Sequence, residues 1–120
     1  MTDTAIEHIQ PKVYRQFTLG TLREHLSAMP ADTALAGIGH WLSSYRGFYD
    51  HVAIEPGRGT TAGALLSLID DRLGDTMEGW GGGTFPITAD CRVFYAQPGD
   101  TGPALVGFDG PAPVLVESTW

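Results

Sequence analysis

A chain of 120 residues with 42% hydrophobic and 18% charged side chains predicts one globular domain with a modest core. Fourteen acidic residues against seven basic ones give a net charge of -7, which disfavours long nucleic acid as a partner, because such binding relies on many Lys or Arg contacts to phosphates. A small anionic ligand remains compatible with this charge, since one arginine in a sheltered pocket can hold a phosphate.

Neither a membrane nor a metal ion is expected as a partner of this chain. The sequence has no apolar run long enough to span a bilayer, and its first ten residues are polar and mixed in charge, unlike a signal peptide. We therefore expect a cytoplasmic protein. His8, His25, His40 and His51 lack metal-ligand spacing, so no metal site and no cofactor are predicted. The single cysteine, Cys91, is interpreted as a buried structural thiol.

The N-terminal residues 1–16 show no clear hydrophobic period, and a proline breaks any helix there. We expect an arm over 1–16 with strand character near 13–17, followed by a single domain over 17–120. A helix is predicted over 18–29, where apolar residues recur at steps of three and four.

Two threonines are candidates for the N-cap of this first helix. Thr18 can cap it, or Thr21 can, with Glu24 completing a Thr-x-x-Glu capping box. After the helix, the sequence predicts a short strand over 34–39 and an irregular stretch over 40–47.

A second strand is predicted over 48–55 from its β-branched and aromatic content. Thr60 or Thr61 is predicted to cap the second helix, and Gly74 ends it in the C′ position. Further strands are predicted over 85–87, 91–97, 104–108 and 114–118. These elements predict an α+β fold in which two amphipathic helices pack on a small, mainly antiparallel sheet.

The segment 41–50 contains four aromatic residues, two serines and one arginine. Aromatic faces can sandwich a base, serine hydroxyls can read its edge, and Arg46 can form a bidentate contact with a phosphate. In the alternative interpretation, Trp41, Phe48 and Tyr49 fill the core while Arg46 pairs with an acidic neighbour. The chemistry of the residues alone leaves both interpretations open.

Two other features have a weaker functional interpretation. The glycines after Trp80, at 81–83, can present backbone N–H groups to an anion, but a plain flexible turn explains them as well. An acid–base role for His51 is conceivable, although a surface histidine without catalytic role is the better interpretation. No catalytic residue is therefore predicted.

The segment 44–56 resembles the signature of a family of small proteins from tailed bacteriophages and their prophages. That signature reads Ser-Tyr-Arg-Gly-aromatic-Tyr-Asp-x-x-Ala-aliphatic-Glu-Pro, and it is matched here from Ser44 to Asp50 and again from Ala53 to Pro56. Two positions depart from the family. Ser43 stands where a histidine is expected. The glycine loop after Trp80 lacks the family's lysine, and with it any contact that this lysine makes as a cation.

The family is similar to phage anti-defence sponges, which are oligomeric proteins that sequester nucleotide immune signals such as cyclic ADP-ribose isomers or cyclic oligonucleotides. The resemblance implies a homo-oligomer that captures a small anionic nucleotide ligand without breaking a bond. It implies these ligand-binding residues: Ser44, Tyr45, Arg46, Gly47, Phe48, Tyr49, Trp80, Gly82, Gly83 and Thr84.

Two rival functions remain at this point. One is a protein-directed inhibitor of a host defence enzyme, which would use the aromatic segment as an exposed contact surface. The other is a hydrolase of a cyclic nucleotide, with His51 or His40 as the base.

Overall fold

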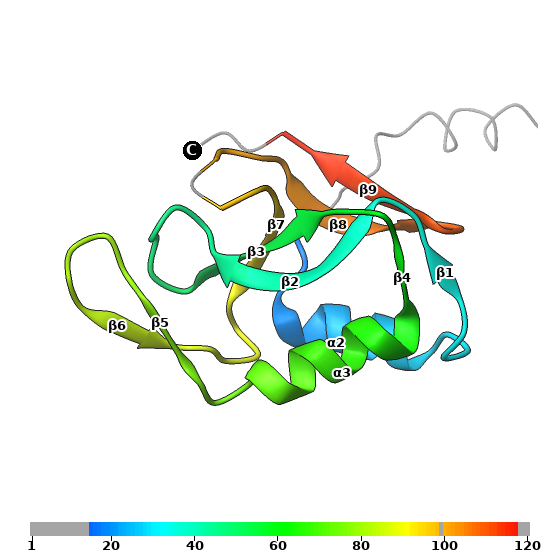
Figure 1. Cartoon of the computed structure of the whole chain (residues 1–120), viewed down its shortest axis with the longest axis horizontal. Helices are drawn as coiled ribbons and strands as arrows, with labels where there is room; N and C mark the ends of the chain where they lie inside the picture. Colours follow the sequence, from blue (N-terminus) through cyan, green and yellow to red (C-terminus); the bar gives the residue numbers. More distant parts are fainter. Residues whose placement is uncertain (1–14, 99, 118–120) are drawn as a thin grey trace, which may run out of the picture.

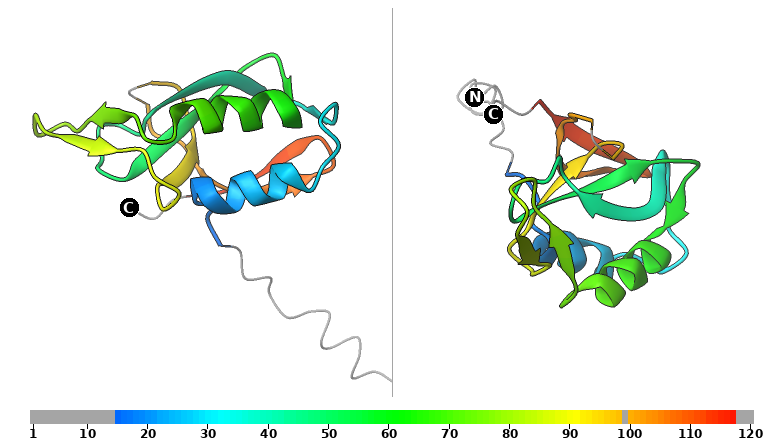
Figure 2. Two further views of the ribbon diagram at one scale, coloured as in Figure 1. Left: turned by 90° about the horizontal axis from the view of Figure 1, so that it is seen from below. Right: turned by 60° about the vertical axis from the view of Figure 1, so that its left-hand side comes forward.

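The computed structural model of the chain describes residues 15–98 and 100–117, in which two helices lie beneath one face of a five-stranded sheet (Figure 1). The helices are α2 (Leu19–Ser27) and α3 (Ala62–Arg72), and Figure 2 shows them side by side. The strands are β1 (Ala34–Leu35), β2 (Ile38–Ser44), β3 (His51–Pro56), β4 (Thr60–Thr61), β5 (Thr76–Glu78), β6 (Thr84–Pro86), β7 (Arg92–Tyr95), β8 (Ala104–Asp109) and β9 (Ala112–Val116).

The main sheet has the strand order β2-β3-β7-β8-β9. Its neighbours pair in antiparallel fashion except β3 and β7, which run parallel. Two further two-stranded pairs, β1-β4 and β5-β6, complete the described structure. The predicted α+β class with a mainly antiparallel sheet is therefore confirmed.

Both predicted helices form, and their caps follow local sequence signals. Thr18 caps α2, and Thr21 closes the capping box by accepting the Thr18 backbone N–H at 2.8 Å. Of the two predicted alternatives, the Thr18 cap is therefore confirmed, and the cap by Thr21 with Glu24 is wrong. Thr61 caps α3, and Gly74 follows that helix with a left-handed φ of 94°. The hydrogen bond from Arg23 of α2 to Asp70 of α3, together with the charge of that carboxylate, raises the pKa of Arg23.

Strand alternation divides the core into two clusters on the two faces of the sheet. Val52 and Ile54 of β3 point toward the helices and belong to the larger cluster. Ala53, between them, belongs to a second cluster with Phe94 of β7 and Tyr45, and this cluster contains no helix residue. The face opposite the helices thus has a small apolar core of its own.

The segment 34–50 differs from its prediction. The expected strand over 34–39 is interrupted at Gly37, which adopts a φ of 73° and accepts a hydrogen bond at 2.6 Å from the Tyr95 hydroxyl. The stretch 40–47, expected to be irregular, mostly belongs to β2. The expected strand over 48–55 begins only at His51, because 45–50 form the turn that joins β2 to β3.

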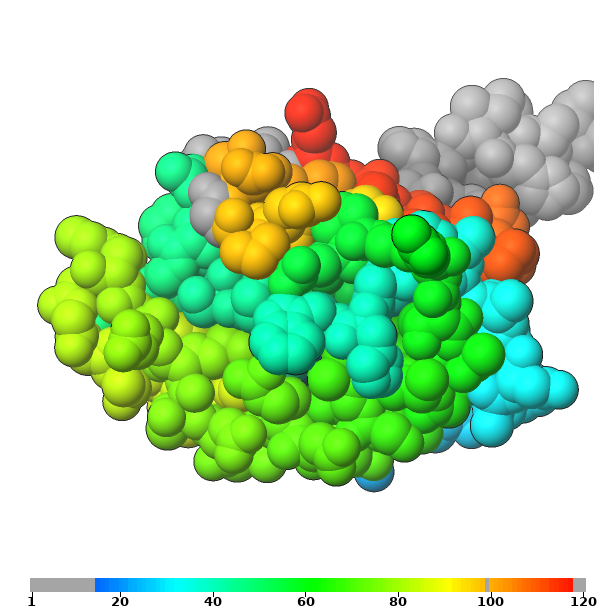
Figure 3. Space-filling view, viewed as in Figure 1, coloured from blue at the N-terminus to red at the C-terminus, as the bar shows by residue number. Residues whose placement is uncertain are grey.

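Differences elsewhere are smaller. Strand β5 was not predicted; it pairs with β6 in a hairpin that forms one end of the molecule, beside the turn between β2 and β3 (Figure 3). The later strands form where expected, with shifted ends.

Most of the predicted arm 1–16 lies outside the described residues. In the part of 13–17 that is described, Phe17 forms no strand but exchanges backbone hydrogen bonds with Val93 and Leu105.

Candidate ligand-binding site

The turn at 45–50 exposes Arg46 through an unusual backbone conformation. Arg46 has a φ of 55° and Gly47 a φ of 76°, so two consecutive residues lie in the left-handed region. For a residue with a Cβ, this conformation costs about 1–2 kcal/mol. The turn is closed by the Phe48 N–H, which donates to the Tyr45 carbonyl at 2.9 Å. Arg46 is therefore held on the surface at an energetic cost, which is a feature often found at functional sites.

Tyr45 anchors this turn to the sheet. It is only 4% exposed, and its ring stacks on Phe94 with 3.8 Å between centroids and 6° between planes. Its hydroxyl donates to the Gly102 carbonyl and accepts from the Gly102 N–H, both at 3.0 Å. The turn at 45–50 is thereby fixed to the segment before β8.

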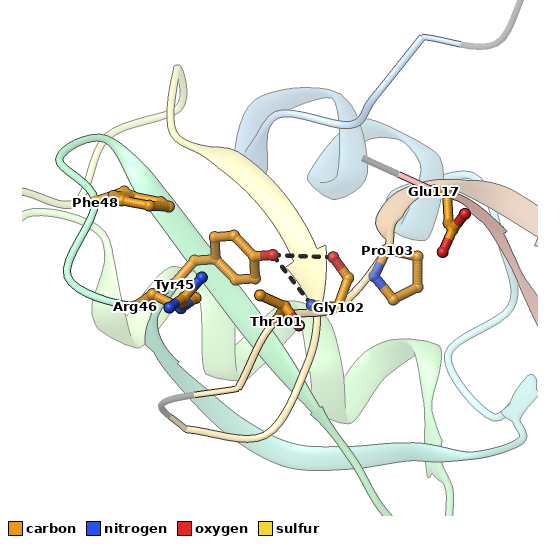
Figure 4. Close-up of a pocket in the computed structure, with 7 residues that line it drawn as sticks. All are labelled: Tyr45, Arg46, Phe48, Thr101, Gly102, Pro103 and Glu117. Carbon is orange, nitrogen blue, oxygen red and sulfur yellow. Dashed lines mark hydrogen bonds between the residues drawn. The ribbon is translucent and has the colours of Figure 1, made fainter. Parts of the chain in front are cut away.

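A cavity of about 520 Å³ lies beside this anchor (Figure 4). Its lining consists of Tyr45, Arg46, Phe48, Thr101, Gly102, Pro103 and Glu117. Because Tyr45 packs tightly against Phe94, the ring that remains available to a ligand is that of Phe48, which is half-buried. The cavity combines an accessible ring, a cation and an anion.

Arg46 is the cationic group of the cavity. Its guanidinium carbon lies 5.9 Å from the centroid of the Phe48 ring, within cation–π range. Among the residues that the structure describes, no ion pair involves Arg46. The guanidinium is thus oriented by an aromatic ring while its hydrogen-bond donors stay available.

The predicted site residues separate into three groups. The cavity brings together Tyr45, Arg46 and Phe48, whereas Ser44 lines a second cavity of about 350 Å³ between β2 and β5. The others line neither cavity: Gly47, Tyr49, Trp80, Gly82, Gly83 and Thr84. Sequence reasoning missed four lining residues, namely Thr101, Gly102, Pro103 and Glu117. No motif in the sequence after position 99 indicated them.

The glycine loop at 79–83 packs against the side chain of Tyr49 and hydrogen-bonds to it. A Cβ on Gly79 would overlap the Tyr49 ring, and the Gly83 N–H donates to the Tyr49 hydroxyl at 3.1 Å. The N–H groups of Trp80 and Gly82 are used as well, by the carbonyls of Gly47 and Gly79. The loop therefore offers an anion few free backbone donors. The close approach of Tyr49 explains Gly79 and Gly83, whereas Gly82 adopts a left-handed φ of 93°.

The substitution Gly79→Ala is expected to destabilise the fold by about 1–3 kcal/mol, because the new methyl group must displace the Tyr49 ring. Gly81→Ala is the matched control, since its Cβ would lie at an ordinary 3.5 Å from the Tyr49 hydroxyl without a left-handed φ. Urea unfolding of both variants measures the difference. Equal stabilities would show that the close contact between ring and loop does not form.

The core-filling interpretation of the aromatic segment holds only for Phe48, which is half-buried and packs against the second apolar cluster. Trp41 is 58% exposed and Tyr49 is 41% exposed, so neither fills the core. His51 lines neither cavity; its ring lies 5.4 Å from that of Phe94 and its Nδ1 is 2.8 Å from the Tyr49 carbonyl oxygen. His40, on the exposed side of β2, does not line them either.

Over 15–98 and 100–117, no group of three or more His, Cys, Asp or Glu side chains is placed to hold a metal ion. Within the same ranges, neither helix has the length and apolar character needed to cross a membrane. Cys91 is buried, as predicted.

Comparison of the chain with protein-family models, with curated proteins and with solved structures finds no match. The geometry of the cavity is therefore the main basis for a functional proposal.

Proposed function

We propose that the protein binds a small anionic nucleotide in the cavity beside Tyr45 and Arg46 and holds it without breaking a bond. In this proposal it is a phage-encoded anti-defence sponge that lowers the free concentration of a nucleotide immune signal in the host cytoplasm. The observation that carries the proposal is Arg46, an arginine without an acidic partner among the described residues, at the edge of a cavity.

The dimensions of the cavity support a small-molecule ligand. Its volume of about 520 Å³ falls in the range of ligand pockets, roughly 300–1,000 Å³. Arg46 can form two charge-assisted hydrogen bonds with one phosphate group, and Phe48 and Pro103 give apolar surface against which the sugar and the base can pack. These contacts match the two parts of a nucleotide, the phosphate and the base.

Sequestration demands affinity rather than catalytic groups. A nanomolar complex corresponds to about -12 kcal/mol. A bidentate contact to phosphate, base stacking and the burial of apolar surface can together supply much of that free energy. A homo-oligomer, as the resemblance implies, would shield an open cavity further, and we include it in the proposal.

The proposal predicts that a bound nucleotide is recovered unchanged. The protein is incubated with cyclic ADP-ribose isomers, cyclic di- and trinucleotides and linear mononucleotides, and bound ligands are identified by native mass spectrometry. Heat denaturation should then release the intact ligand in stoichiometric amount, and the same spectra give the number of subunits. Release of a cleaved product would support the hydrolase instead, and absence of any bound nucleotide would contradict the proposal.

One observation favours the second candidate, a protein-directed inhibitor. Trp80 is 77% exposed and Trp41 is 58% exposed, and tryptophan is enriched among the residues that dominate protein interfaces. The double substitution Trp41→Ser and Trp80→Ser separates the two functions. It leaves nucleotide capture intact if the cavity is the functional site, whereas it abolishes inhibition of a partner protein if these rings form the contact.

A further inference from the structure

Glu117 is an acidic residue in the same cavity as Arg46. It lies just after β9, and Figure 4 shows it beyond Pro103, at the opposite end of the lining from Arg46 and Phe48. Its side chain makes no hydrogen bond or ion pair with another residue of the described ranges. The two ends of one cavity therefore carry opposite charges, and neither charge is neutralised by a described neighbour.

A carboxylate restricts the ligands that such a cavity accepts. An ionised glutamate only accepts hydrogen bonds, so the group that faces it must donate one. A second phosphate at this end would be repelled, whereas an amino group would be attracted. A ligand that spans the cavity must therefore be negative at one end and rich in hydrogen-bond donors at the other.

We infer that Glu117 makes the cavity selective for nucleotides whose base carries an exocyclic amino group, with the phosphate at Arg46 and the amino group at Glu117. Adenine, guanine and cytosine meet this requirement, and guanine can donate twice to one carboxylate through its N1–H and its amino group. Pro103, next to Glu117 in Figure 4, provides apolar surface for the face of the base. This inference rests on the proposed nucleotide binding and adds the base class to it.

The test uses two pairs of nucleotides that differ by one amino group each. AMP is compared with purine riboside 5′-monophosphate, and GMP is compared with IMP, by isothermal titration calorimetry on the full chain. For at least one pair, the wild-type protein should bind the amino-bearing member about tenfold more tightly, as expected for a hydrogen bond to a charged group.

Substitution of the carboxylate should remove this preference. In Glu117→Ala, we expect the affinity ratio within each pair to approach one. The nucleotide with the amino group should bind more weakly, because it loses its hydrogen-bond acceptor. The nucleotide without the amino group should bind equally or more tightly, because a charge that repels it is lost. Asp109→Asn is the control; it removes one exposed carboxylate that does not line the cavity.

The outcomes separate this inference from the proposed function. Binding of all four nucleotides with ratios near one in the wild-type protein would overturn the role of Glu117 and leave nucleotide capture standing. A preference that persists in Glu117→Ala would overturn it too. If none of these four nucleotides binds while a cyclic nucleotide is captured in the native mass spectra, the role of Glu117 is overturned and nucleotide capture stands. If neither the four mononucleotides nor any cyclic nucleotide binds, both the inference and the proposed function are wrong.

Discussion

Replacing Arg46 by alanine is expected to weaken nucleotide binding at least a hundredfold. Among the described residues that line the cavity, Arg46 is the one cationic residue, and two charge-assisted hydrogen bonds to a phosphate contribute about 3–6 kcal/mol. Isothermal titration calorimetry with the nucleotide found by mass spectrometry measures the loss. Arg58→Ala is the control of equal charge, since Arg58 is exposed and lines neither cavity.

A second variant at this position tests the backbone strain independently. Arg46→Gly and Arg46→Ala both lose the guanidinium and its contact with Phe48, so their difference reports the left-handed φ of 55°. We expect the glycine variant to be more stable than the alanine variant by about 1 kcal/mol in urea unfolding. At most positions a glycine variant is less stable than the corresponding alanine variant.

In the binding measurement, equal affinities of the wild-type protein and Arg46→Ala would show that Arg46 does not hold the ligand.

Removal of the Tyr45 ring is expected to have the largest effect on stability. Tyr45→Ala should lower the free energy of unfolding by about 3–5 kcal/mol, because it empties the space against Phe94 in the second apolar cluster. Tyr45→Phe keeps the stack but leaves both polar groups of Gly102 without their partner, and we expect a loss of about 1–3 kcal/mol. Urea unfolding measures both effects.

The matched control for Tyr45→Phe is Tyr49→Phe. Tyr49→Phe also removes one hydroxyl. Because Tyr49 is 41% exposed, water can replace its hydrogen bond to Gly83, and we expect the free energy of unfolding to fall by less than about 1 kcal/mol. If the two substitutions cost the same, the hydroxyl of Tyr45 does not fix the turn to the segment before β8. A small loss in Tyr45→Ala would place that ring outside the core.

Local signals in the sequence were sufficient for most of the elements. The apolar spacing of α2 and α3, their threonine caps and the terminating Gly74 depend on residues within a few positions of one another, so periodicity and capping predict them. The predicted boundary between β2 and β3 was wrong because it relied on the strand preference of individual residues. Aromatic residues favour strands, yet Phe48 and Tyr49 lie in a turn because Arg46, Gly47 and Asp50 adopt positive φ.

What the sequence determined by itself is both helices, most of the strands and the α+β class. What only the tertiary structure decided is which residues share the cavity. Tyr45 and Gly102 are 57 positions apart, and Glu117 enters the cavity through the order in which β7, β8 and β9 pair. Such contacts arise from the packing of distant segments on one face of the sheet, and no periodicity or spacing along the chain encodes them locally.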